Sequence, residues 1–233
     1  MTEPSTRAAS AHAAVRTSFT AGSTRPIAHR RKVLEQLLAL LVEHDKELCA
    51  AITSDVGRHE AAAYVGDIFP CMAQVRLALE SVEQWAKPQK IGVPFYLQPG
   101  KAELVPEPKG VVLIISPYNY PVTLLLSPLA AALAAGNCCV IKPSEHAPAT
   151  NHLLASLVPR YLDPSVVRLL DGGVDVSKAL LALRWCVRAP PAHPPARRGG
   201  ACSRVVSGCN RGAPNSSGCV ARVCLTSSPT NPR

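Results

Sequence analysis

The sequence predicts an α/β protein, with N-terminal helices and a β-hairpin arm followed by the first three strands of a doubly wound parallel sheet. Two patterns carry this prediction. Before residue 86, apolar residues recur every three to four positions, which is typical of amphipathic helices. From residue 111 to 184, short β-branched runs alternate with helical stretches. That order favours parallel strands joined by right-handed crossovers.

The N-terminal stretch predicts three helices. The first covers residues 11–22 and the second covers 26–56, with Gly57 as its C-terminal stop. The third covers residues 60–86, where Pro70 should kink the helix or mark a break. The apolar stripes of the second and third helices are interpreted as core.

Residues 89–108 change in character. Apolar runs flank Pro99 and Gly100, a pair that is typical of a turn, so this segment predicts a β-hairpin. Such an arm could make an oligomer contact or could be an ordinary surface ribbon. We group residues 1–106 as one unit of helices and arm.

Residues 107–185 predict a second unit, the first half of a Rossmann-like sheet. Its strands are expected in the runs GVVLIIS, CCVIKP and SVVRLLDGG, and its helices at residues 128–137, 148–161 and 175–184. The strands read as continuous apolar runs because parallel strands are buried on both faces.

Residues 111–141 carry no charge over 31 positions, which is long enough to cross a bilayer. Pro117, Asn119 and Gly136 are among the residues that interrupt this run, and each is unfavourable in a lipid-exposed helix. Two strands and a helix inside an α/β core account for the same composition. The sequence therefore predicts no membrane span, with a membrane-attached protein as the alternative.

The net charge of +9 belongs to the end of the chain. Residues 176–233 contain no acid and hold Lys178 and eight arginines, so residues 1–175 are neutral. This balance predicts no nucleic-acid binding by the folded part. Residues 186–233 lack apolar periodicity and predict a disordered basic tail. We interpret that tail as an out-of-frame translation, with a nucleic-acid-binding tail as the alternative.

Nine cysteines are present, none in C-x-x-C spacing, so a zinc site or a disulfide framework is only weakly supported and we expect no metal site. Cys138 and Cys139 lie within an expected strand and should be buried and inert. The N-terminus has no apolar signal-peptide core. Its Arg, Ser and Ala content faintly suggests a transit peptide, but we expect a cytoplasmic protein.

Three polar residues follow two of the expected strands. Asn119 lies in the segment SPYNYP, and Lys142 and Glu145 follow the next strand, at the same carboxyl edge of the sheet. An Asn amide can donate to a developing oxyanion, and an ammonium and a carboxylate can bracket a ribose. Taken singly, each residue is better explained as a turn Asn or a solvated loop charge.

Residues 107–150, PKGVVLIISPYNYPVTLLLSPLAAALAAGNCCVIKPSEHAPAT, resemble the aldehyde dehydrogenase superfamily, and within it the class 3, fatty-aldehyde-type branch. The similar features are a first cofactor-domain strand, a P-[WY]-N-[FY]-P loop, an A-L-A-A-G-N helix end and a V-x-K-P-S-E strand end. The resemblance covers about residues 10–185.

The resemblance implies oxidation of an aldehyde substrate to a carboxylic acid with NAD or NADP. Asn119 would be the oxyanion-hole amide, and Lys142 and Glu145 would hold the adenosine ribose. Ser116, Pro117 and Tyr118 would line the cofactor through their backbone. A homo-oligomer, or pairing with full-length subunits, would be the expected assembly.

The sequence departs from the family pattern after residue 185. It contains no F-T-G-S-like turn for a pyrophosphate, no E-L-G-G-K segment with a general-base Glu, and no nucleophilic Cys in a G-Q-x-C context. We therefore expect this chain to be truncated before the catalytic Cys and Glu and to be inactive alone. The alternative is a non-catalytic fragment that interacts with full-length subunits.

Overall fold

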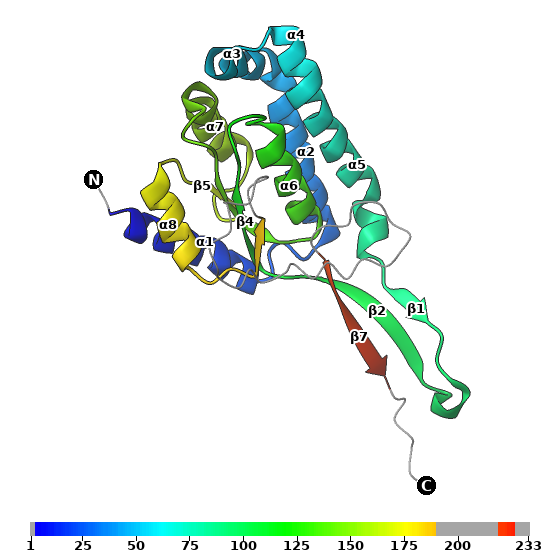
Figure 1. Ribbon diagram of the computed structural model, residues 1–233. Coiled ribbons are helices and arrows are strands. Elements are labelled where there is room, and N and C mark those ends of the chain that lie inside the picture. The colour runs from blue at the N-terminus through cyan, green and yellow to red at the C-terminus, as the bar shows by residue number, and fades with distance from the viewer. Residues whose placement is uncertain (1–2, 190–218, 227–233) are drawn as a thin grey trace, which may run out of the picture.

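The computed structural model describes residues 3–189 and 219–226. Helices surround a parallel sheet, and a hairpin arm projects away from both (Figure 1). The helical region comprises α1 (Pro4–Thr20), α2 (Ile27–Glu43), α3 (Asp45–Val56), α4 (Glu60–Ala63), a π-helical turn η1 (Tyr64–Ile68) and α5 (Phe69–Ala86).

The prediction of one helix over residues 26–56 is wrong, because the chain breaks at His44 between α2 and α3. The His44 ring lies 3.0 Å from the Tyr161 hydroxyl, a contact over 117 residues. Leu41 and Leu48 are buried on either side of the break, so the apolar periodicity continues across it. Gly57 ends α3 in the left-handed conformation, as predicted.

The predicted break in the third helix is confirmed. The π-helical turn η1 directly precedes α5, and Pro70 lies in the first turn of α5. Proline is tolerated there because the first N–H groups of a helix have no intrahelical acceptor.

The hairpin is confirmed, with different bounds for its first strand. Strand β1 (Gln89–Ile91) pairs antiparallel with β2 (Lys101–Pro108), and a short 3-10 turn, η2 (Phe95–Leu97), lies between them. The apolar residues before Pro99 therefore belong to the connection. The Phe95 side chain is 88% exposed.

The parallel sheet contains β3 (Val111–Ile115), β4 (Cys138–Lys142), β5 (Val167–Leu169) and β6 (Val187–Ala189), in the order β5-β4-β3-β6. The three predicted strands are thereby confirmed, and every pair is parallel. Strands β3 and β4 are almost entirely buried, including Cys138 and Cys139.

Two segments of the region after residue 185 pair with strands of the preceding part of the chain. Strand β6 adds to the edge of β3, and β7 (Cys219–Thr226) pairs antiparallel with β2. Both β3 and β2 would otherwise present unpaired N–H and C=O groups, which favour strand addition. The other residues of the expected tail, 190–218 and 227–233, lie outside the described part of the chain.

Three helices connect or follow the strands, namely α6 (Thr123–Ala134), α7 (Pro148–Tyr161) and α8 (Val174–Ala182). Helix α7 has the predicted bounds. Helix α6 begins earlier than predicted and contains Pro128 in its interior. No helix within residues 3–189 combines the length and apolar character that a bilayer crossing requires.

Carboxylates of the N-terminal helices cap the helices of the sheet region. Neither α6 nor α7 has a capping side chain of its own. Asp67 of η1 accepts the N–H groups of Val122 (3.4 Å) and Thr123 (2.5 Å) at the start of α6. Asp55 of α3 accepts N–H groups in the first turn of α7. These bonds fix the N-terminal helices against the sheet region.

Candidate cofactor and catalytic site

The candidate site lies on the two loops that follow β3 and β4 at the carboxyl edge of the sheet. Ile115 and Lys142 are partners in the parallel register, and the Ser116 N–H donates a 3.1 Å bond to the Lys142 carbonyl. The strand ends are therefore adjacent, and the six predicted site residues share one edge. This edge is where open α/β sheets bind ligands.

The Ser116 side chain is buried without a hydrogen-bond partner. Only 4% of the residue is exposed, and its Oγ atom meets no donor or acceptor within the described residues. A buried hydroxyl without a partner costs free energy, so such a group at a strand end indicates a place for a polar ligand or water.

Lys142 and Glu145 form an ion pair directly after β4. The Lys142 ammonium, only 1% exposed, donates to Glu145 Oε2 at 2.7 Å and to the Pro143 carbonyl at 3.1 Å. An ammonium has three donors, so one has no partner within the described residues. Glu145 is 32% exposed, and its hydrogen bond with Lys142 lowers the pKa of the carboxyl below its usual value. The pair therefore offers a fixed donor and an ionised acceptor.

Tyr118 connects the two loops. Its ring meets the His146 ring edge-to-face, with centroids 6.1 Å apart. Pro117 is half-buried, whereas Tyr118 is 53% exposed. The first loop thus lies against the second at this point, and an apolar ring faces solvent beside the ion pair.

Asn119 is held through its main chain. The Arg58 guanidinium donates a 2.7 Å bond to the Asn119 carbonyl and lies 4.0 Å from the centre of the Tyr120 ring. The Asn119 side-chain amide has no hydrogen-bond partner in the described part of the chain, so its donors are available.

Arg58 and Asp67 also contact this loop, and neither could be recognised as a site residue from the sequence. Arg58 looks like a solvated charge after the Gly57 helix stop, and Asp67 looks like a polar position on a helix. Their contacts to the Asn119 loop span 61 and 55 residues of the chain. No local spacing signals contacts of that range; an unexpected charge within an apolar helix face is the only clue that Asp67 offers.

Four cysteines of the N-terminal helices and the sheet are buried, namely Cys49, Cys71, Cys138 and Cys139. Cys138 and Cys139 are buried, as predicted, and burial raises the pKa of Cys138 to about 11 and that of Cys139 well above the ordinary value, which favours the protonated thiols. Cys71 is likewise buried, with a pKa raised to about 12. None of these thiols is suited to act as a nucleophile.

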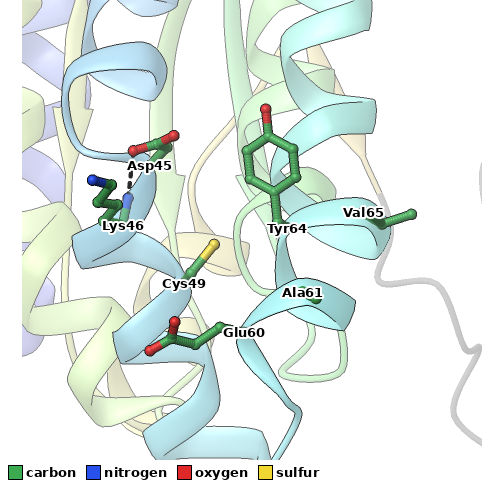
Figure 2. Close-up of a pocket in the computed structure, with 7 residues that line it drawn as sticks. All are labelled: Asp45, Lys46, Cys49, Glu60, Ala61, Tyr64 and Val65. Atoms are coloured by element: carbon green, nitrogen blue, oxygen red, sulfur yellow. Dashed lines mark hydrogen bonds between the residues drawn. The ribbon is translucent and has the colours of Figure 1, made fainter.

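A separate cavity of about 300 Å³ lies between α3 and the α4–η1 segment (Figure 2). It is lined by Asp45, Lys46, Cys49, Glu60, Ala61, Tyr64 and Val65. Burial raises the pKa of the Cys49 thiol. None of the predicted site residues lines this cavity, so it is distinct from the candidate site.

Comparison with known proteins decides the family. The aldehyde dehydrogenase family model matches residues 2–184. The chain belongs to the aldehyde dehydrogenase family. An aldehyde dehydrogenase of Craterostigma plantagineum is 43% identical over 171 residues, which cover 73% of this chain and 36% of the relative. Family 3 member H1 of Arabidopsis thaliana is 40% identical, with 73% and 35% covered. These relatives confirm the resemblance to family 3.

Solved structures of the family show the same fold. A substrate-bound state of AldH from Staphylococcus aureus superimposes with a TM-score of 0.73 at 29% identity, covering 75% of this chain and 38% of AldH. Among the curated sequence relatives, the dog enzyme named dimeric NADP-preferring aldehyde dehydrogenase is 35% identical over 170 residues. This chain spans about a third of the length of the curated relatives that it matches.

Proposed function

We propose that this chain supplies the ribose-binding pair and the oxyanion donor of an NAD(P)-dependent aldehyde dehydrogenase site, which oxidises an aldehyde to a carboxylic acid. The observation that carries this proposal is the Lys142–Glu145 pair at the carboxyl edge of the sheet. A buried ammonium with a remaining donor, next to an ionised carboxylate, is poorly explained as a solvated loop.

The residues at this edge fit a dinucleotide in three respects. Ribose hydroxyls both donate and accept, which matches the Glu145 carboxylate and the remaining Lys142 donor. The buried Ser116 hydroxyl lacks a partner that a bound polar group would provide. The exposed Tyr118 ring offers an apolar surface beside them. These fits support both NAD and NADP, because no described contact discriminates between the two.

The residues of this chain would bind and orient. NAD(P) when bound supplies the hydride acceptor. Lys142 and Glu145 would hold the adenosine ribose, while the backbone of Ser116, Pro117 and Tyr118 would line the cofactor. The Asn119 amide would donate to the oxyanion that forms when a thiolate attacks the aldehyde, a contact that stabilises the transition state.

The thiolate and the general base are not identified in this sequence. We therefore propose that the 233-residue chain turns over no aldehyde by itself. A second candidate function is pairing with full-length family subunits. The hairpin arm favours it, because Phe95 and Tyr96 are exposed there and large exposed apolar residues commonly mark protein contacts. We retain the cytoplasm as the proposed compartment.

Isothermal titration of the purified chain with NAD+ and with NADP+ tests the proposal. We expect saturable binding of at least one of them, weakened about tenfold or more by Lys142→Met and by Glu145→Gln. Lys178→Met, a change of the same kind on α8, is the matched control and should leave binding unchanged. Binding that is insensitive to both site variants would place the nucleotide elsewhere and contradict the proposal.

A further inference from the structure

Two side chains of the N-terminal helical region bind the loop that carries Asn119. Arg58, in the connection after α3, donates to the Asn119 carbonyl at 2.7 Å. Asp67 of η1 accepts the N–H groups of Val122 and Thr123, where the loop enters α6. Neither side chain belongs to the sheet region. The loop is therefore held from outside the unit in which it is located.

Arg58 makes two contacts with this loop at once. One nitrogen, Nη2, bonds the Asn119 carbonyl, and the guanidinium carbon lies 4.0 Å from the centre of the Tyr120 ring. A planar guanidinium can donate in its plane and stack through its face, whereas an ammonium has no plane with which to stack on the ring. Both contacts fall on consecutive residues of the loop, so together they fix the peptide unit that joins Asn119 to Tyr120.

The other terminal nitrogen of Arg58, Nη1, is buried and has no hydrogen-bond partner among the described residues. A buried donor without a partner costs free energy. The two contacts with the loop must therefore offset an unfavourable placement, which a merely solvated arginine would not require. The Asp67 carboxyl interacts electrostatically with Arg58. Burial raises the pKa of this carboxyl, and Arg58 opposes that rise.

Holding the Asn119 carbonyl has a consequence for its side chain. The carbonyl carbon and the side chain share one Cα, so fixing the peptide plane in a loop whose ends are anchored restricts rotation about the Cα–C bond. The Ser116–Lys142 backbone bond and Asp67 anchor the two ends of the same loop. The side-chain amide of Asn119 can then change direction mainly through rotation about its own side-chain bonds.

We propose that Arg58 is a positioning residue for Asn119: it fixes the peptide plane after Asn119 and thereby aims the side-chain amide. The proposal rests on the oxyanion role given above to Asn119. Donors in such sites act because they are held in place before the charge develops, and displacements near 1 Å cost about a hundredfold in rate. The N-terminal helices would then contribute to the chemistry of a site that lies in the sheet region.

Backbone 15N relaxation of the purified chain tests the positioning role without requiring turnover. We expect order parameters near 0.85 for the Asn119 and Tyr120 amides in the wild type. Arg58→Met should lower both below about 0.6 while the order parameters in α6 stay unchanged. Arg58→Lys should restore them only in part. Arg76→Met removes an exposed arginine on α5 and serves as the matched control.

Rigid Asn119 and Tyr120 amides in folded Arg58→Met protein would overturn the proposal, as would full restoration by Arg58→Lys. If Arg58→Met does not fold, the rotation of the Arg58 terminal nitrogens is measured in the wild type instead. Slow rotation supports the positioning role of Arg58, and free rotation overturns it. Nucleotide titration is recorded on the same samples. Failure of the wild type to bind NAD(P) would count against the proposed function. The dynamics of the Asn119 and Tyr120 amides test the positioning role of Arg58 separately.

Discussion

The Asp55 carboxylate accepts the Thr150 N–H at 2.7 Å, although the two residues lie 95 positions apart. Its other oxygen accepts the Ala149 N–H at 2.9 Å. A carboxylate at this position satisfies N–H groups in the first turn of α7 and interacts favourably with the helix dipole. A side chain on α3 thus performs the capping that α7 lacks locally.

Asp55→Ala is therefore expected to lower the free energy of unfolding by about 1–2 kcal/mol, measured by urea denaturation. Asp55→Asn should lose less, because its amide oxygen still accepts one bond. Glu80→Ala, at an exposed position of α5, is the control and should change stability by less than about 0.5 kcal/mol. Equal effects of Asp55→Ala and Glu80→Ala would show that the cap contributes nothing.

Asp67 predicts a stability that depends on pH. Burial raises the pKa of its carboxyl from 3.8 to about 6, against the opposing effects of the Thr123 and Val122 N–H groups and Arg58. The raised pKa means that the folded state favours the protonated form. Protonation of Asp67 therefore contributes to the free energy of unfolding. This contribution is fully present below about pH 4 and is lost as the pH rises through about 6.

Denaturation of the wild type and Asp67→Asn across pH 4 to 7 measures this dependence. The stability of the wild type relative to Asp67→Asn should fall over that window, by at most about 3 kcal/mol. A difference between the two proteins that stays constant from pH 4 to 7 would contradict the raised pKa.

Gly136 predicts a steric conflict, and Gly57 provides a matched comparison. Both have positive φ, 84° and 71°. A Cβ at Gly136 would lie 2.7 Å from the Arg30 guanidinium carbon, whereas at Gly57 it would meet nothing within 4 Å. Arg30 cannot easily move aside, because it donates to the carbonyls of Thr24, Arg25 and Ala134.

Gly57→Ala should therefore cost about 1–2 kcal/mol, from backbone strain alone. Gly136→Ala should cost at least about 2 kcal/mol more, because it also disrupts hydrogen bonds of a buried charged group. Thermal or urea unfolding of both variants measures the difference. Equal losses would show that Arg30 relaxes freely.

The absence of an identified nucleophile predicts that the purified chain forms no NADH above background with saturated aldehydes. Formation of NADH is followed by absorbance, with a full-length family enzyme as the positive control. Turnover that Asn119→Ala abolishes would contradict this prediction and would place a nucleophile in this chain.

Much of the fold could be predicted because its signals are local. The β-branched runs of β3 and β4 and the proline at the start of α7 indicate those elements directly. The break at His44 could not be predicted, since burial continues on one face across it. Strand β6 was missed because a strand of three residues at a sheet edge carries little apolar pattern.

Some residues of the candidate site could likewise be predicted from the sequence, and others could not. Asn119, Lys142 and Glu145 could be placed together from the sequence, because the ends of adjacent parallel strands meet at one edge. Arg58 and Asp67 could not, since both lie more than 50 positions away from the loop residues that they contact. The sequence therefore indicated the groups that would face a ligand, and the structure adds those that hold them.

The most direct test of the proposed cofactor site is a titration of the 15N-labelled chain with NAD+ and NADP+, followed by amide chemical shifts. We expect saturable shifts to concentrate in residues 116–119 and 142–146 and to require about tenfold more nucleotide in Lys142→Met. Shifts that concentrate elsewhere, or no shifts at millimolar nucleotide, would contradict it.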